Sequence, residues 1–180
     1  MLKFLSTKPT AQQFKIFIML QIITIPNPIL KQISLPIQKI DSEVKNLVSG
    51  MREIMLSSSH CVGIAAVQVG VLSRLILADV SLNPKPHHNN GLLVMINPKI
   101  TYASGKLKSR EGCLSVPDFT GNVIRKNKIE VEYTDIDGNL QKLKTHGFES
   151  IVIQHEIDHL DGIVFLDRVS SLKSDIFKRM

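Results

Sequence analysis

The chain has 180 residues, of which 43% are hydrophobic and 21% charged, a composition that fits one globular domain and excludes a disordered chain. Its two cysteines are too few for a disulfide scaffold in a chain of this length. The formal net charge of +6 favours acidic surroundings such as RNA or a ribosome surface. A basic surface that is simply solvated would give the same net charge. The sequence contains no motif of aromatic and basic residues typical of RNA-binding domains, so sequence-specific recognition of nucleic acid is not expected.

Residues 1–18 are predicted to be an N-terminal extension, either disordered or upstream of a true start at Met19, and residues 19–180 a single catalytic domain. No acidic residue occurs before Asp41. In this respect the N-terminal segment resembles a targeting peptide, but only weakly. The apolar run at 16–25 is interrupted by polar residues and is shorter than the ~20 residues of a membrane span, so no membrane association is expected. The expected location is the cytoplasm, as in bacteria, with organelle targeting by the extension left open.

The first half of the domain shows a helix followed by strand patterns. From Asp41 to Met55 apolar residues recur at helical spacing, and Asp41 is the expected N-cap. A small-residue stretch runs from Gly63 to Gly70. Residues 74–80 then predict a buried strand, and the proline- and asparagine-rich segment 83–91 predicts a surface loop.

The second half predicts a strand, a hairpin and two helices. The hairpin combines two alternating strands with an Asp137-Gly138 turn, and Gly162 is placed to end the first helix. This order indicates an α+β fold. The predicted elements are a strand at 92–96 ended by Asn97-Pro98, hairpin strands at 129–133 and 140–143, a helix at 148–160, and a short basic C-terminal helix at 174–180.

The segment His155-Glu156-Ile157-Asp158-His159 carries the strongest chemical signal. On a helix, His155 and His159 lie on one face with Cβ atoms about 6 Å apart, within reach of one metal ion. Glu156 then lies beside an open coordination position, as an acid–base group of a hydrolase would. The alternative is two surface histidines on a charged helix face.

A third ligand is needed, and it is predicted upstream. Zinc proteases with this motif take their third ligand from a His or Glu further along the chain. The 21 residues after His159 contain neither, so this kind of third ligand is excluded. Cys113 lies beside Gly112, where the backbone can approach closely. A thiolate with two imidazoles suits Fe²⁺ or Zn²⁺. A buried inert thiol is the weaker alternative, and His60 with Cys61 is a weak rival metal pair.

Three motifs occur along the chain, and they are Gly63-Ile64-Ala65-Ala66-Val67-Gln68, Glu111-Gly112-Cys113-Leu114-Ser115 and Gln154-His155-Glu156-Ile157-Asp158-His159. Together and in this order they resemble the peptide deformylase family. The resemblance runs from about Met19 to beyond Arg168 and implies antiparallel sheets packed around a central metal-bearing helix. It also implies hydrolysis of the formyl group from the N-terminal formylmethionine of newly made proteins.

The resemblance assigns roles residue by residue. Cys113, His155 and His159 would be the metal ligands and Glu156 the catalytic carboxylate. Gln68 and the Leu114 N–H would bind the formyl oxygen. Fe²⁺ is the expected native ion, with Zn²⁺, Ni²⁺ or Co²⁺ able to substitute. The residues implied in binding the N-formylmethionyl peptide of a nascent chain are Gly63, Ile64, Glu111, Gly112, Phe148, Ile151 and Val152.

Two departures from the family pattern leave other functions open. Cys61 stands where the first motif usually opens with Gly, and its side chain is expected to crowd the substrate or narrow the mouth of the site. Glu149-Ser150 replaces a common Ala-Arg, which changes surface charge more than chemistry. The alternatives are a metal-binding protein without catalysis, a zinc endopeptidase, and a ribosome-binding module that uses the basic segment 174–180.

Overall fold

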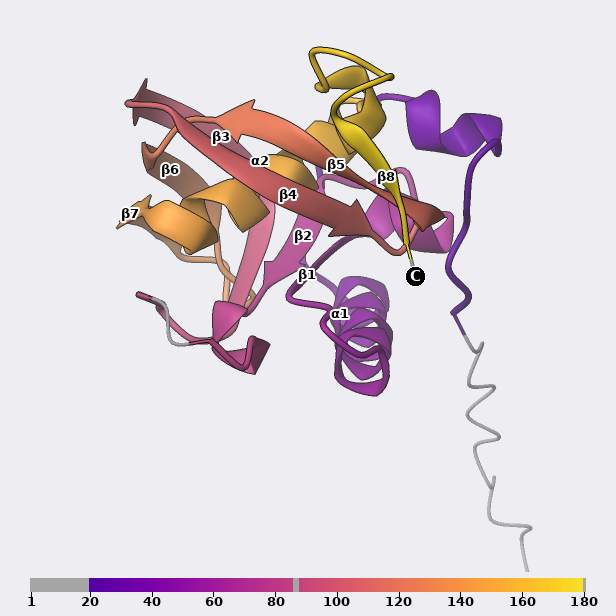
Figure 1. The fold of residues 1–180 in the computed structure, drawn as a ribbon. Coiled ribbons are helices and arrows are strands. Elements are labelled where there is room, and N and C mark those ends of the chain that lie inside the picture. The colour runs from indigo at the N-terminus through magenta and orange to yellow at the C-terminus, as the bar shows by residue number, and fades with distance from the viewer. Residues whose placement is uncertain (1–19, 86–87, 180) are drawn as a thin grey trace, which may run out of the picture.

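The computed structural model describes residues 20–85 and 88–179. In this part of the chain two antiparallel sheets and two α-helices form an α+β fold, as predicted (Figure 1). The extension predicted at 1–18 lies outside the described residues. The elements are α1 (Ser42–Ser57), β1 (Gly63–Ala65), β2 (Leu75–Ala78), β3 (Leu93–Ser104), β4 (Leu107–Cys113), β5 (Val116–Arg125), β6 (Lys128–Thr134), β7 (Leu140–His146), α2 (Gly147–Leu160) and β8 (Ile176–Lys178).

Helix α2 is the centre of the fold. One sheet has the strand order β1-β2-β3-β6-β7, and Ile153 and Leu160 of α2 pack on it among fully buried apolar residues. The other sheet has the order β4-β5-β8, and the polar side chains of α2 contact β4 and β5. Helix α1 packs on the first sheet through a second apolar cluster that contains Met51 and Met55. The sheets therefore enclose α2 and hold its side chains in fixed positions.

The long amphipathic elements are where the sequence predicts them. Asp41 caps α1, because its carboxylate accepts hydrogen bonds from the Glu43 and Val44 N–H groups at 3.0 and 3.2 Å. Strands β6 and β7 form the predicted hairpin, with Gly138 at φ 90° in its turn. The predicted helix at 148–160 is α2, and among the described residues no helix is long and apolar enough to cross a membrane.

Two predictions at the ends of elements are wrong. The strand predicted at 92–96 continues through Asn97-Pro98 to Ser104, with a register shift after Ile96. Asn97 adopts φ 53° and its side chain pairs with both backbone polar groups of Ile37 at 2.8 Å, so the strand bends there without ending.

The C-terminal helix predicted at 174–180 is also wrong. Residues 176–178 form strand β8 instead, which pairs with β5 through Thr120 opposite Phe177. Isolated short helices are marginal in water, whereas the free edge of β5 offers unpaired backbone groups. The edge of a sheet therefore decides the conformation of this segment.

Candidate metal centre

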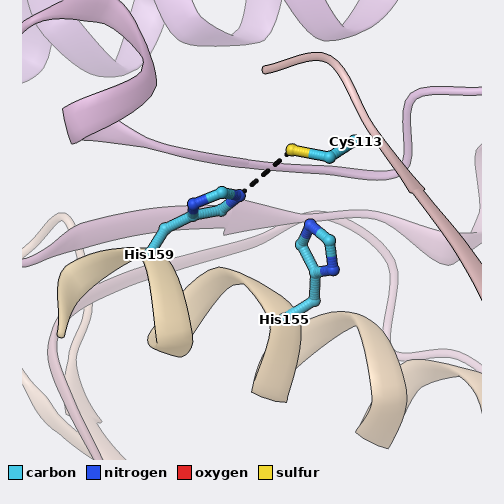
Figure 2. A group of neighbouring side chains, drawn as sticks. All are labelled: Cys113, His155 and His159. Atoms are coloured by element: carbon cyan, nitrogen blue, oxygen red, sulfur yellow. Dashed lines mark hydrogen bonds between the residues drawn. The ribbon is translucent and has the colours of Figure 1, made fainter. Parts of the chain in front are cut away.

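The two predicted histidines lie one turn apart on α2 and face the end of β4 (Figure 2). Cys113 lies where β4 meets a register shift, and its Sγ is 3.2 Å from Nε2 of His159. One ligand atom from each of Cys113, His155 and His159 lies within 4.8 Å of the other two, and all three residues are buried. The structure thus brings together the three residues that the sequence predicts as metal ligands.

The environment of the three residues fits a divalent cation. Glu111 Oε2 is 2.8 Å from Nδ1 of His155, which leaves the other ring nitrogen for an ion. Burial lowers the pKa of His159 well below its ordinary value, so this imidazole stays neutral, as a ligand must be. Burial opposes a charge on His155 too, but hydrogen bonds with Cys113 and Glu111 raise its pKa. A cation bound at the site would displace the extra proton of a protonated His155 ring.

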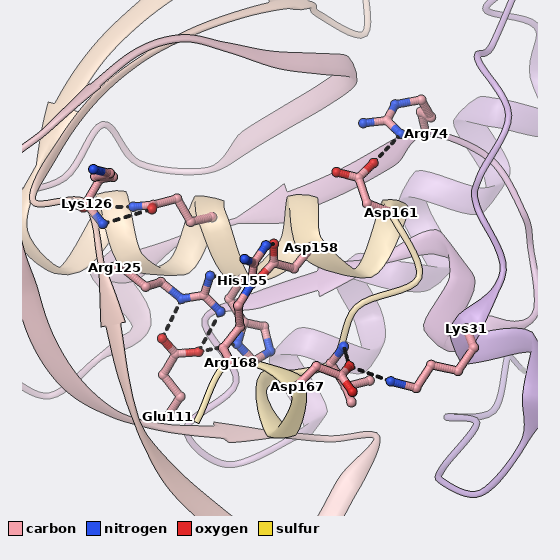
Figure 3. A network of polar contacts seen from close by, with 12 residues as sticks. Lys31, Arg74, Glu111, Arg125, Lys126, His155, Asp158, Asp161, Asp167 and Arg168 are labelled. Atoms are coloured by element: carbon pink, nitrogen blue, oxygen red, sulfur yellow. Dashed lines mark hydrogen bonds and ion pairs between the residues drawn. The ribbon is translucent and has the colours of Figure 1, made fainter. Parts of the chain in front are cut away.

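A network of charged side chains fixes the Glu111 carboxylate that contacts His155 (Figure 3). Both carboxylate oxygens of Glu111 accept hydrogen bonds from Arg125, at 2.5 and 2.9 Å. Arg125 also donates to Asp158 on α2 at 2.8 Å, and Arg168 pairs with the same carboxylate. The network links β4, β5, α2 and the segment after it. Neither Arg125 nor Asp158 is a predicted site residue, and the motifs contain no signal for their pairing.

Glu156 is buried and directly follows His155 on α2. Burial raises the pKa of Glu156 to about 7, and its Oε2 has no hydrogen-bond partner among the described residues. A Cβ on residue 63 would lie 2.5 Å from its Oε1, so the absence of a side chain at Gly63 leaves room for the carboxylate in this position. A protonatable carboxylate with a free oxygen at this position suits proton transfer near neutral pH.

Gln68 is held in one orientation next to Cys113. Its Oε1 accepts a hydrogen bond from the Ala65 N–H at 2.8 Å, which directs the amide NH₂ group towards Cys113 Sγ at 3.3 Å and Ser115 Oγ at 3.2 Å. Leu114 lies in the tight turn between β4 and β5. Both predicted oxyanion donors are therefore on segments that adjoin Cys113.

A cleft of about 230 Å³ opens beside the metal centre. Five of the predicted substrate-binding residues line it together with His155 and Glu156, namely Glu111, Gly112, Phe148, Ile151 and Val152. Glu111 contributes more than a lining surface, because its carboxylate is held by Arg125 and His155. Six further lining residues are not predicted from the sequence, and they are His60, Val62, Ser109, Arg110, Thr120 and Arg179.

Cys61 and Ile64 turn their side chains away from the cleft. Both pack in the apolar cluster under α1, and neither lines the cleft. The expectation that Cys61 narrows the mouth of the site is therefore wrong in its geometry. Burial raises the pKa of the Cys61 thiol to about 12, and its Sγ lies 3.3 Å from the Gly63 carbonyl oxygen. Cys61 and Ile64 are therefore core residues of this cluster.

A larger cavity of about 760 Å³ lies on the far side of α2. It is lined by basic residues such as Lys99 and Lys126 and by Asp158 and Asp161, but by none of the three predicted metal ligands. The smaller cleft is the candidate substrate site, because it alone of the two reaches His155 and Glu156.

Comparisons with known proteins agree with this geometry. Residues 19–175 match the family described as polypeptide deformylase. A peptide deformylase of Rhizobium meliloti is 40% identical over 159 residues, which cover 88% of this chain and 89% of that protein. The crystal structure of peptide deformylase from Ehrlichia chaffeensis superposes with a TM-score of 0.77 at 38% identity, covering 86% of this chain and 89% of that one.

A third relative was solved with a peptide. The class I type b peptide deformylase of Acinetobacter baumannii, bound to Met-Ala-Ser, superposes with a TM-score of 0.77 at 33% identity. The superposition covers 84% of this chain and 99% of that one.

Proposed function

The chain belongs to the polypeptide deformylase family, and we propose that Cys113, His155 and His159 hold its divalent cation with Glu156 as the acid–base group. It is a metal-dependent hydrolase that removes the formyl group from the N-terminal formylmethionine of new proteins. The observation that carries the residue assignment is the approach of three ligand atoms to within 4.8 Å beside a buried carboxylate.

The proposed native ion is Fe²⁺, with Zn²⁺, Ni²⁺ or Co²⁺ able to replace it. One thiolate and two imidazoles form a donor set that suits both iron and zinc. When bound, such an ion supplies a Lewis acid that lowers the pKa of water to about 7. The thiol of Cys113 would bind as the thiolate, stabilised by the ion itself.

Glu156 would move the protons of the reaction. A carboxylate with a pKa of about 7 can accept a proton from the attacking water and pass it to the departing amine. Its Oε2 forms no hydrogen bond with the described residues, so no protein group competes there for the proton. Because Gly63 leaves room for this side chain, a larger residue there would displace the carboxylate and reduce turnover.

Gln68 and the Leu114 N–H would stabilise the negative charge that develops on the formyl oxygen. The hydrogen bond from Ala65 holds the Gln68 amide in place, so the donor is oriented before the substrate arrives. The substrate peptide would lie between β1 and β4, since both are edge strands with free backbone groups. Its methionine side chain would contact Phe148, Ile151 and Val152 in the cleft.

The proposed partners are N-formylmethionyl peptides of nascent chains, met at the ribosome. The net charge of +6 supports association with the anionic surface of the ribosome. The proposed location is the cytoplasm, by analogy with the bacterial relatives.

The first test is deformylation of formyl-Met-Ala-Ser by protein purified anaerobically with Fe²⁺. Glu156→Ala should keep stoichiometric metal and lose about 100- to 10,000-fold in turnover. His155→Ala should lose both metal and activity. Metal binding without turnover in the wild type would favour a non-catalytic metal protein, and cleavage of casein would favour an endopeptidase.

A further inference from the structure

Strand β8 lies next to the C-terminal end of the described chain (Figure 1), and Arg179, the residue that follows it, lines the cleft. Phe119, Thr120 and Gly121 of β5 pair with β8, and the Arg179 N–H continues this pairing by donating to the Asp118 carbonyl oxygen at 2.7 Å. Arg179 thus becomes part of the lining of the cleft next to the metal centre.

Arg179 lies directly over Gly112, the residue before Cys113. A Cβ on residue 112 would collide with the Nη2 atom of Arg179, so the missing side chain of Gly112 makes room for the guanidinium. Gly112 belongs to β4, whose outer edge is free to pair with a substrate peptide. The charge of Arg179 therefore lies beside the strand along which the peptide would run.

Arg110 adds a second positive charge to the same rim. Its Nε donates to Thr120 Oγ1 at 2.9 Å, and its guanidinium lies 4.1 Å from the ring centroid of Phe177 on β8. In the described part of the chain neither Arg110 nor Arg179 forms an ion pair with a carboxylate. Glu111, the nearest acidic residue in sequence, is already bound by Arg125 and His155.

We propose that Arg179 and Arg110 form a carboxylate-binding subsite that recognises an acidic side chain in the first three residues after the formylmethionine. A formylated amine has no charge, so the side chains of these residues are the charges that a nascent chain brings to the rim. Guanidinium groups bind carboxylates through paired, directional hydrogen bonds. The subsite rests on the proposed function and adds substrate selectivity to it.

The test measures kcat and KM for formyl-Met-Ala-Ala-Ala amides in which Asp, Asn or Lys replaces each alanine in turn. Amidation removes the C-terminal carboxylate, which Arg179 would otherwise bind in place of a side chain. The wild type should prefer Asp over Asn by about two- to fivefold in kcat/KM at one of these positions, through KM, as for a solvent-exposed ion pair. The Lys peptide should be the poorest, and 1 M salt should remove the differences.

Arg179→Gln should abolish the preference for Asp while leaving hydrolysis of the Asn peptide unchanged in kcat, and Arg179→Lys should restore part of it. Lys178→Gln is the matched control, because side chains alternate along β8 and Lys178 faces away from Arg179. Equal kcat/KM for Asp and Asn peptides in the wild type, or a preference that survives in Arg179→Gln, overturns the subsite alone. Absence of turnover with every peptide would overturn the proposed function as well.

Discussion

Helix α2 and strand β8 are held in place by different interactions, although α2 and Arg179, the residue after β8, line the same cleft. Every residue of α2 from Glu149 to Leu160 is buried, and its polar side chains pair with β4 and β5 (Figure 3). Strand β8 has three residues, none of them buried, and pairs with β5 alone. Substitutions in the α2 network should therefore reduce both folding and metal binding, whereas substitutions at the end of β8 should change which peptides bind.

The largest expected effect is on stability, at the arginine at the centre of the network. Arg125→Met leaves the carboxylates of Glu111 and Asp158 buried without their shared cation, so the free energy of unfolding should fall by about 3–5 kcal/mol. The measurement is urea denaturation at pH 7. The control is Arg74→Met, which removes an Arg–Asp pair of similar length to the half-exposed Asp161, and should cost no more than about 1 kcal/mol.

The same pair of variants predicts a difference in pH dependence. Burial alone would raise the pKa of Glu111, but hydrogen bonds from His155 and Arg125 outweigh burial and lower it below 4.5. A carboxylate whose pKa is lower in the folded protein stabilises it above that pH, and the contribution is lost as the pH falls through the folded-state pKa. Wild type and Arg74→Met should therefore lose more stability below pH 4.5 than Arg125→Met. Parallel curves for the three proteins would contradict the network as described.

A smaller effect is expected on metal affinity, at Glu111, which contacts the proposed metal ligand His155. Glu111→Gln removes the negative charge next to Nδ1 of His155, so metal affinity should fall about 10- to 100-fold. Competition with a chelator, using Zn²⁺ as the probe, measures the dissociation constant. Glu149→Gln is the matched control. Glu149 of α2 is a buried carboxylate like Glu111 of β4, but it pairs with Asn90 and Thr145 and not with His155. If both variants kept wild-type affinity, Glu111 would not be a support for the ligand.

The same contrast explains what could be predicted from the sequence. His155, Glu156 and His159 lie within one helical turn, so their spacing alone places them together. Helix α1 and the β6–β7 hairpin follow likewise from periodicity, a cap and a turn within a short segment. Local patterns thus predict the helix that carries two of the proposed metal ligands, and the glycine beside Cys113 is the one local sign of the third.

The partners of that helix depend on pairing between distant segments. Arg125 reaches Glu111 and Asp158 only because β4 pairs with β5 and both pack on α2, and no local spacing encodes these contacts. The sequence predicts a helix in place of strand β8 for the same reason. Its apolar residues fit a helix equally well, and the free edge of β5 that captures it exists only in the folded protein.

The smallest effect on activity is expected at Cys61, which is buried beside the cleft but belongs to neither region. Cys61→Gly should lower the free energy of unfolding by about 1–2 kcal/mol, because it removes a packed side chain and adds backbone freedom. The kcat/KM for formyl-Met-Ala-Ser should stay within about twofold, since the thiol faces the cluster under α1. Cys61→Ala keeps the Cβ and should recover part of the stability at the same activity. A large gain in kcat/KM on substitution to glycine would instead mean that the thiol obstructs the peptide.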